Sequence, residues 1–499
     1  MADPLSATTG RVTVRLYCQG IGDCHLLRFP KADGGSFWMM IDCGVHSSVK
    51  GGSDMIDRVV ADIATQTTHL DVIVVTHEHT DHLSGFATAA EAFKAFTVGE
   101  VWMAWTEKPG DLQARQIDKY KQQALAALQM TSQRLDGVAA LSPHVSALRS
   151  GLDALLGFNF GAKGDRVRAA RDAVERLAGG HVRYCEPADP PITLAGLPGL
   201  RIYVLGPPRD PKLLGITEQS SAMYQSAFGA GGPVAQALTA AFGAAAAEAG
   251  APDLAAPFDP NAGTDLQRLA ASATPPDDIA PEIAAFARDH YFGPAPISAP
   301  AIRSRRRTKT VDKKEHDQSW RRIDLDWLGV SADLAMQLDD RTNNTSLVLA
   351  FELTDTRRVL LFAGDAQAGN WLSWQDTRWT VDGHAVTGPD LLARTVFYKV
   401  GHHGSHNATL KEKGLELMTS KDLSAFIPTN QKDAKKIGWG QMPFASILNA
   451  LDERCAERVI RADDPWVAGT AAKPGFETPS GSIRALRHQP GLWVELELA

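Results

Sequence analysis

The chain has few cysteines, and they form no recognisable framework. Its 499 residues include five cysteines, an odd number, and none stands in Cys-x-x-Cys spacing. This pattern argues against a disulfide-stapled fold and favours a reducing compartment, so we expect a cytoplasmic protein. The stretch from Met1 to Gly10 has no cationic start followed by an apolar core, which argues against a signal peptide.

Long apolar runs and a strong charge of one sign are also missing. No run of about 18 apolar residues occurs, so we expect neither a transmembrane helix nor a membrane partner. The net charge of −7 is modest and indicates no polyanion partner for the chain as a whole. No Gly-x-Ser-x-Gly elbow is present, so no serine nucleophile of that kind is expected.

What the chain does have is ample material for a core. Hydrophobic residues make up 44% of the sequence, an ordinary share for a globular protein. A length of 499 residues predicts either two domains or one domain with large insertions.

A cluster of potential metal ligands follows a short apolar run. Residues 72–75 are β-branched and unbroken, which is typical of a buried strand. His77, His79, Asp81 and His82 come directly after it. Sites in α/β sheets are usually built in loops at this end of a strand. Four such side chains predict two neighbouring metal sites, and imidazole with carboxylate suits zinc, and also manganese or iron.

Two later stretches repeat the pattern of an apolar strand followed by polar side chains. One ends in Asp365, and a buried carboxylate at a strand end is costly without cationic partners. The other, residues 396–400, leads into His402 and His403. Consecutive residues of an extended segment point to opposite sides, so one of the two histidines should face the site. Glycines 401 and 404 flank the pair and allow a tight turn, which would let the second histidine face the site as well.

Taken in order, these motifs resemble the metallo-β-lactamase superfamily, whose signature is His-x-His-x-Asp-His after a strand. More narrowly, the turn at 19–24, the strand end at 40–44, the Asn-Asn strand start at 343–349 and His-His-Gly-Ser at 402–405 resemble the β-lactamase-like domain of ComEC-type DNA-uptake proteins. The resemblance covers about 1–104, 182–208 and 341–499. It implies an α/β (α+β) fold, the four-layer αββα sandwich, with large helical and irregular insertions.

The resemblance also implies roles for single residues. Two divalent metal ions, zinc before manganese, would be bound by His77, His79, Asp81, His82 and Asp365, with Asp365 bridging them. Asp42 would support the first metal-binding histidine from outside the coordination sphere. Asp81 is a catalytic candidate, and His402 or His403 would act as a general acid or as a further ligand.

Two positions depart from the family pattern. Residues 206–208, Gly-Pro-Pro, stand where many members have a further histidine ligand, which puts the third ligand of the first metal in question. Met442 and Pro443 stand where the family often has His-Pro, so the second metal either lacks a ligand or uses His402 or His403.

The motifs divide the chain into a core and two insertions. Residues 1–104 and 341–499 form the metallo-β-lactamase-like core, and 182–208 add a core strand. Residues 105–181 form a helical insertion, in which Val167, Ala170 and Val174 recur at helical spacing. Residues 209–340 form an insertion rich in Ala, Pro and Gly. Its basic segment, with Arg305, Arg306 and Arg307, is a candidate phosphate contact or else a solvated loop.

These features predict a metal-dependent hydrolase that uses a metal-activated water. The favoured substrate is a phosphodiester, as a small molecule or a nucleic acid, and this choice rests on the resemblance, because a fold does not fix a function. One alternative is hydrolysis of a small ester, lactone or thioester. The other is a metal-binding regulatory or scaffold protein whose incomplete ligand set has weakened catalysis.

Overall fold

The structure is a computed structural model. It describes residues 11–138, 165–219, 223, 279–287, 290–291, 338–436, 441–473 and 481–498. The chain divides into two compact units, and the first consists of Met1–Leu125, Ala154–Ala230 and Met336–Ala499. Of the second unit, the described residues belong chiefly to the end of α4 (Leu112–Val138) and to α10 (Pro281–Ala287). Arg305, Arg306 and Arg307 lie outside the described residues, so their phosphate contact stays a prediction.

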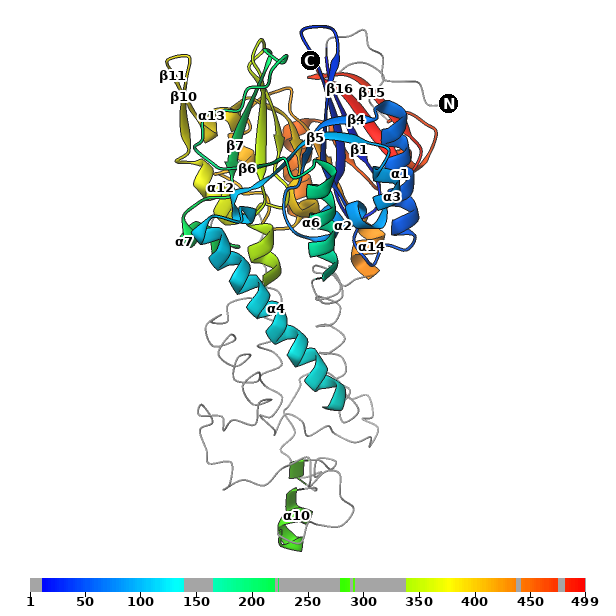
Figure 1. Cartoon of the computed structure of the whole chain (residues 1–499), viewed down its shortest axis with the longest axis vertical. Helices are drawn as coiled ribbons and strands as arrows, with labels where there is room; N and C mark the ends of the chain where they lie inside the picture. The colour runs from blue at the N-terminus through cyan, green and yellow to red at the C-terminus, as the bar shows by residue number, and fades with distance from the viewer. Residues whose placement is uncertain are drawn as a thin grey trace, which may run out of the picture. The chain divides into compact units, whose positions relative to one another are not determined.

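In the described part of the first unit, the larger sheet has eight strands in the order β15-β16-β1-β2-β3-β4-β5-β6. Figure 1 labels β1, β4, β5, β6, β15 and β16 of this sheet. β3 to β6 run parallel, whereas the other neighbours are antiparallel. The strands are β1 (Val12–Tyr17), β2 (Cys24–Pro30), β3 (Ser36–Cys43), β4 (His69–Val74), β5 (Thr97–Ala104), β6 (Val182–Cys185), β15 (Ile483–Gln489) and β16 (Trp493–Leu498).

The second sheet has six strands among the described residues, in the order β14-β13-β12-β9-β8-β7. β9, β12, β13 and β14 run parallel, and β7 and β8 are antiparallel to their neighbours. The strands are β7 (Leu200–Gly206), β8 (Val348–Leu353), β9 (Arg358–Phe362), β12 (Thr395–Lys399), β13 (Ser424–Ile427) and β14 (Val459–Arg461). A separate hairpin is formed by β10 (Arg378–Val381) and β11 (His384–Thr387).

Both faces of each sheet are covered. All six residues of β8 are buried, because Leu349 and Phe351 point into the core between the sheets while Val348 and Ala350 point to the helices outside. Between the sheets, the rings of Phe29 and Phe351 stack with centroids 5.7 Å apart. The alternation of side chains along the strand therefore builds two cores at once.

Helices form the outer layers. The first sheet is covered by α1 (Gly52–Gln66), α2 (Thr80–Thr88), α3 (Ala90–Phe93) and α6 (Asp165–Leu177). The second sheet is covered by α12 (Ala368–Trp374), α13 (Gly388–Ala393) and α15 (Ala445–Cys455). This arrangement confirms the predicted αββα sandwich. Shorter helices are α7 (Pro211–Leu214), α14 (Gln431–Lys436) and α16 (Pro465–Ala468).

Within residues 105–181, the described residues form helices. α4 begins at Leu112, and α6 buries the predicted stripe of Val167, Ala170 and Val174 against the first sheet. Among the described residues, no helix is both long enough and apolar enough to cross a membrane.

Candidate metal centre

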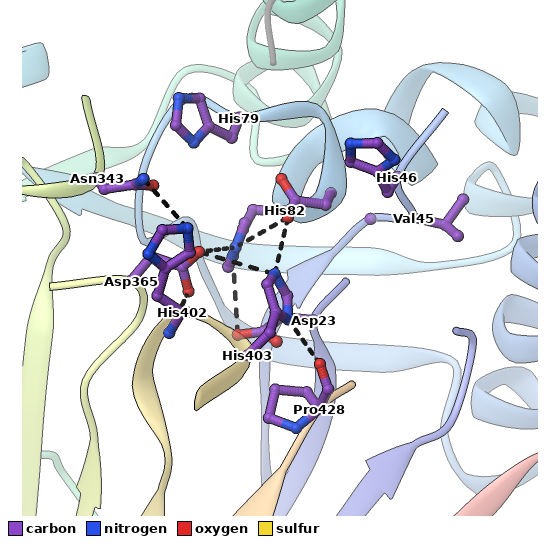
Figure 2. A network of polar contacts seen from close by, with 12 residues as sticks. Asp23, Val45, His46, His79, His82, Asn343, Asp365, His402, His403 and Pro428 are labelled. Carbon is purple, nitrogen blue, oxygen red and sulfur yellow. Dashed lines mark hydrogen bonds and ion pairs between the residues drawn. The ribbon is translucent and has the colours of Figure 1, made fainter. Parts of the chain in front are cut away.

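Segments from both sheets meet at one edge of the sandwich. β4 ends at Val74, and Asp81 and His82 stand in the first turn of α2. Asp365 follows β9, and His403 follows β12. Each of these four buried residues offers one potential ligand atom, and the four atoms lie within 4.8 Å of one another. Figure 2 shows His82, Asp365 and His403 pointing toward one another.

His77 and His79 adjoin this cluster. Nε2 of His77 lies 3.1 Å from Nδ1 of His79, and the rings of His77 and His82 lie 4.2 Å apart. Both side chains are buried. The structure thus brings together all five ligands expected from the sequence, and His403 with them. Their binding of metal stays a prediction.

Glycines allow the loops to pack closely around Asp81. A Cβ atom on Gly44 would collide with the backbone of Asp81, and Gly22 adopts a positive φ of 142° beside the same residue. The amide of Asp23 donates to the Asp81 carbonyl at 3.0 Å. The turn at 20–23 and the strand end at 42–44 are therefore glycine-rich because they clamp the start of α2.

Asp42 lies beneath the cluster but differs from the family expectation in its partner. Its Oδ2 lies 2.7 Å from Nδ1 of His82, and it also accepts from the amide and hydroxyl of Thr76 at 2.8 and 2.7 Å. Asp42 therefore supports His82 directly. It reaches His77, the first histidine of the motif, only through Thr76. The carboxylate sits beside His82 because Asp42 is the last residue but one of β3, which pairs with β4 in the sheet.

Hydrogen bonds fix the tautomers of His82 and His403. Nδ1 of His403 lies 2.6 Å from the Pro428 carbonyl, which only accepts, so this nitrogen carries the proton. Nδ1 of His82 donates to Asp42 in the same way. The Nε2 atoms then face inward: that of His82 lies 3.2 Å from Asp365, and that of His403 lies 2.9 Å from Asp81.

The tautomer of His77 is also fixed by a hydrogen bond, in this case to Thr76. The Thr76 hydroxyl donates to Asp42, so it accepts from Nδ1 of His77 at 3.1 Å. Nε2 of His77 is left facing His79. An imidazole that binds a metal usually donates its other N–H to an oxygen in this manner. The donor set and its tautomers therefore fit divalent ions.

The electrostatics of the cluster favour cations. Burial alone would lower the pKa of His82, but Asp365 and Asp42 raise it well above the usual value. Burial would raise the pKa of Asp365, yet His82 and Lys399 hold it well below its usual range. Buried carboxylates that attract protons onto neighbouring imidazoles also attract divalent ions.

One member of the histidine pair lies in the cluster. His403 is fully buried there, whereas His402 is half-buried, and its Nε2 lies 3.4 Å from the side-chain nitrogen of Asn343. The backbone is a left-handed turn, with φ of 44° at His402 and 53° at His403. The amide of His402 donates to Asp365 at 3.1 Å, so the turn also holds the carboxylate.

Comparison with protein families agrees with this geometry. Residues 19–127 match the family model described as Metallo-beta-lactamase superfamily. The match supports the metallo-β-lactamase superfamily. It includes the motif from His77 to His82, while Asp365 and His403 are brought to that motif by the fold. Neither the comparison with curated proteins nor that with solved structures found a match. The narrower ComEC-type likeness therefore stays a prediction.

The two departures from the superfamily pattern have structural reasons. A Cβ atom on Gly206 would collide with Oδ1 of Asn370, whose side chain is hydrogen-bonded to Asn344, so a larger residue at 206 would displace that side chain. Met442 is buried in a small apolar cluster with Ile21 and Ala434. Neither position offers a ligand side chain, whereas His403 lies in the buried cluster.

Sequence reasoning missed a buried lysine. Lys399, at the end of β12, forms an ion pair with Asp23, donates to the Gly364 carbonyl at 3.0 Å and lies 3.5 Å from Asp365. Its side chain is 1% exposed. A single charged residue in an otherwise apolar strand was the available signal. Asp23 lies 376 positions away in the sequence, so the ion pair could not be predicted from local sequence.

A second missed network holds the loop of residues 75–79 from outside. Glu78 lies between His77 and His79, and its carboxylate lies 2.9 Å from Arg171 on α6 and 3.4 Å from Lys121 on α4. Arg171 also contacts Glu107 at 3.1 Å. Burial would raise the pKa of Glu78, but Lys121 and Arg171 lower it to about 2. The helices between β5 and β6 therefore anchor the loop.

Arg171→Ala should destabilise the protein. Loss of the guanidinium leaves Glu78 and Glu107 facing each other with Lys121 as their remaining cation, at an expected cost of about 2–4 kcal/mol in the free energy of unfolding. Urea unfolding followed by tryptophan fluorescence measures this cost. Arg183→Ala, which removes the exposed pair with Glu100 (N–O distance 3.4 Å), should change the free energy by less than about 1 kcal/mol. Equal stability of the two variants would contradict the anchoring role.

Proposed function

We propose that the protein is a metal-dependent hydrolase whose favoured substrate is a phosphodiester. The superfamily match and the buried His/Asp cluster support metal-dependent hydrolysis in general. The observation that carries the proposal is the convergence of Asp81, His82, Asp365 and His403, with inward Nε2 atoms on both histidines. The preference for a phosphodiester rests on the motif likeness described above.

The residues divide between two ions. Nε2 of His77 and Nδ1 of His79 would hold the first ion, and Asp81, His82 and His403 would hold the second. Asp365, which lies among the ligands of the second ion, would serve both. Divalent ions supply Lewis acidity and activate water near neutral pH, and zinc is the first candidate, with manganese the alternative.

His402 is the residue of this group best placed to reach a substrate. It lies at the edge of the cluster, half-buried, and its backbone amide is tied to Asp365. Its Nε2 and the Asn343 side chain lie 3.4 Å apart. We assign His402 and Asn343 to the binding of substrate oxygens and the leaving group, and His403 to metal binding.

Metal analysis combined with a substrate panel tests the proposal. We expect purified protein to bind zinc and to hydrolyse bis(p-nitrophenyl) phosphate faster than p-nitrophenyl acetate, a lactone or a thioester, with activity lost on chelation and restored by zinc. Faster turnover of the ester, lactone or thioester would favour the alternative hydrolase. A protein that binds zinc but hydrolyses none of these would support the scaffold function.

His403→Ala and His402→Ala should differ in kind. His403→Ala removes a proposed ligand, so both metal content and hydrolysis should fall. His402→Ala should keep its metal and lose about 10²–10⁴-fold in kcat, as expected for a group acting on the leaving group. Metal content and kcat are measured on the same samples. Full metal content in both variants would contradict the division of roles. Full activity in both variants would show that neither histidine has a role in hydrolysis.

A further inference from the structure

His79 differs from the other histidines in the nitrogen that it presents. His77, His82 and His403 direct Nε2 inward, whereas His79 directs Nδ1 toward His77, at 3.1 Å. Its Nε2 lies 3.5 Å from Oδ1 of Asp339. The His79 side chain is 3% exposed and that of Asp339 is 21% exposed, so the contact is largely shielded from water.

We infer that Asp339 is the positioning residue of the first metal site, holding the proton of His79 on Nε2 so that the Nδ1 lone pair faces the ion. The inference rests on the proposed function. His79 would then have an oxygen beside its outer ring nitrogen, as His82 has Asp42 and His403 has the Pro428 carbonyl, with the two ring nitrogens exchanged. The distance is longer for His79, at 3.5 Å against 2.7 and 2.6 Å.

The segment that carries Asp339 is anchored to the metal-binding loop. The amide of Leu347 donates to the Thr76 carbonyl at 2.8 Å. The side chain of Asn344 donates to the carbonyls of Leu213, Leu214 and Ile216, at 3.2, 2.9 and 3.1 Å. Asp339 is therefore held on a fixed support, as a residue that orients a ligand must be.

The helical turn of residues 338–343 has two faces, which contact different parts of the protein. Asp339 and Asn343 are four residues apart, so they share one face, and they contact His79 and His402. Leu338 lines a cavity of about 310 Å³ together with Arg341 and Thr345. The face toward the histidines carries a carboxyl and an amide side chain, which agrees with a role at the metal centre.

The first site has particular need of such support. Gly206 supplies no third ligand, so the site depends on His77, His79 and Asp365. Misorientation of His79 would remove one of few donors. By contrast, the second site has His82 and His403 fixed independently, by Asp42 and by Pro428. The inference therefore predicts an effect confined to one of two ions.

Asp340 provides the matched control. Its carboxylate accepts from the side chain of Gln367 at 2.7 Å, and the structure records no contact between it and a histidine of the cluster among the described residues. Asp339→Asn and Asp340→Asn thus replace a carboxyl group by an amide at adjacent positions, and Asp339→Ala removes the acceptor altogether. Asparagine is isosteric with aspartate, so Asp339→Asn serves as the variant that keeps the local shape.

Zinc titration of the full-length protein against a chromophoric chelator tests the inference. Wild type should bind two ions per chain. Asp339→Ala should bind one of them about 10–100-fold more weakly and keep the other, with a smaller loss in the same site for Asp339→Asn. Asp340→Asn should match wild type within about twofold, since it leaves the outer partners of the ligands in place. Circular dichroism checks that each variant is folded.

Long-range ¹H–¹⁵N spectra of histidine-labelled, zinc-loaded protein give a second readout. The His79 ring should be protonated at Nε2 in wild type and should change its pattern in Asp339→Ala, while His82 and His403 keep theirs. Wild-type zinc affinity at both sites in Asp339→Ala would overturn the inference. An equal loss of affinity at both sites would overturn it as well. Absence of zinc binding by wild type would overturn the proposed function, and the inference with it.

Discussion

Asp365→Ala should remove bound metal and abolish hydrolysis. Asp365 is 1% exposed, lies 3.2 Å from Nε2 of His82 and 3.8 Å from Nε2 of His403, and is the proposed shared ligand. Its loss removes the carboxylate next to the imidazoles of His82 and His403. We expect a fall in activity of about 10⁴-fold, because the Lewis acid supplies several kcal/mol of transition-state stabilisation.

Asp355→Ala is the control for that experiment. Asp355 is an exposed carboxylate in the turn that joins β8 to β9, whereas Asp365 follows the other end of β9. Its loss should leave metal content and kcat unchanged. Elemental analysis and hydrolysis of bis(p-nitrophenyl) phosphate are measured side by side. An Asp365→Ala protein with its full complement of metal would contradict the assignment.

Lys399→Met should cost about 3–5 kcal/mol in the free energy of unfolding, because removal of one partner leaves buried charges uncompensated. Lys399 is the cation between Asp23 and Asp365, and methionine has nearly its length without the charge. Lys94→Met, which removes an exposed ion pair with Glu91, should change the free energy by less than about 0.5 kcal/mol. Urea unfolding monitored by tryptophan fluorescence gives both values.

The effect of Lys399→Met on the free energy of unfolding should depend on pH in a definite direction. Burial would raise the pKa of Asp23, but Lys399 lowers it, so the contribution of Asp23 is present above the unfolded value of about 3.9 and is lost as pH falls. Burial would lower the pKa of Lys399, but Asp23 and Asp365 raise it, so its contribution is present below about 10.4 and is lost at higher pH. The stability difference between wild type and Lys399→Met should therefore be largest near neutral pH and shrink both in acid and above about pH 10. Stability of Lys399→Met within about 1 kcal/mol of wild type at pH 7 would contradict this account.

The sequence predicted the members of the cluster because strand ends carry local signals. Apolar runs before His77, Asp365 and His402 indicated where strands stop, and parallel strands place such ends at one edge of a sheet. The αββα layers followed from the resemblance and are confirmed. The choice between His402 and His403 depended on a left-handed turn, which local sequence allowed without determining.

Contacts between distant segments could not be predicted in the same way. Asp42 was expected beside the first histidine of the motif but contacts His82, because β3 pairs with β4 and places the carboxylate under the start of α2. Glu78 gains its partners from helices in residues 105–181, and Asp339, which contacts His79, lies at the end of residues 209–340, so both pairs involve predicted insertions. A side chain's partner depends on the whole fold, whereas a strand end depends on a few residues.

The central claim is that this cluster binds two divalent ions. Anomalous diffraction at the zinc edge, from crystals of zinc-loaded protein, tests it most directly. The account predicts two peaks, one next to Nε2 of His77 and Nδ1 of His79 and the other among Asp81, His82 and His403, with Asp365 between them. Zinc bound only elsewhere on the protein, with the cluster histidines and carboxylates still hydrogen-bonded to one another, would contradict it.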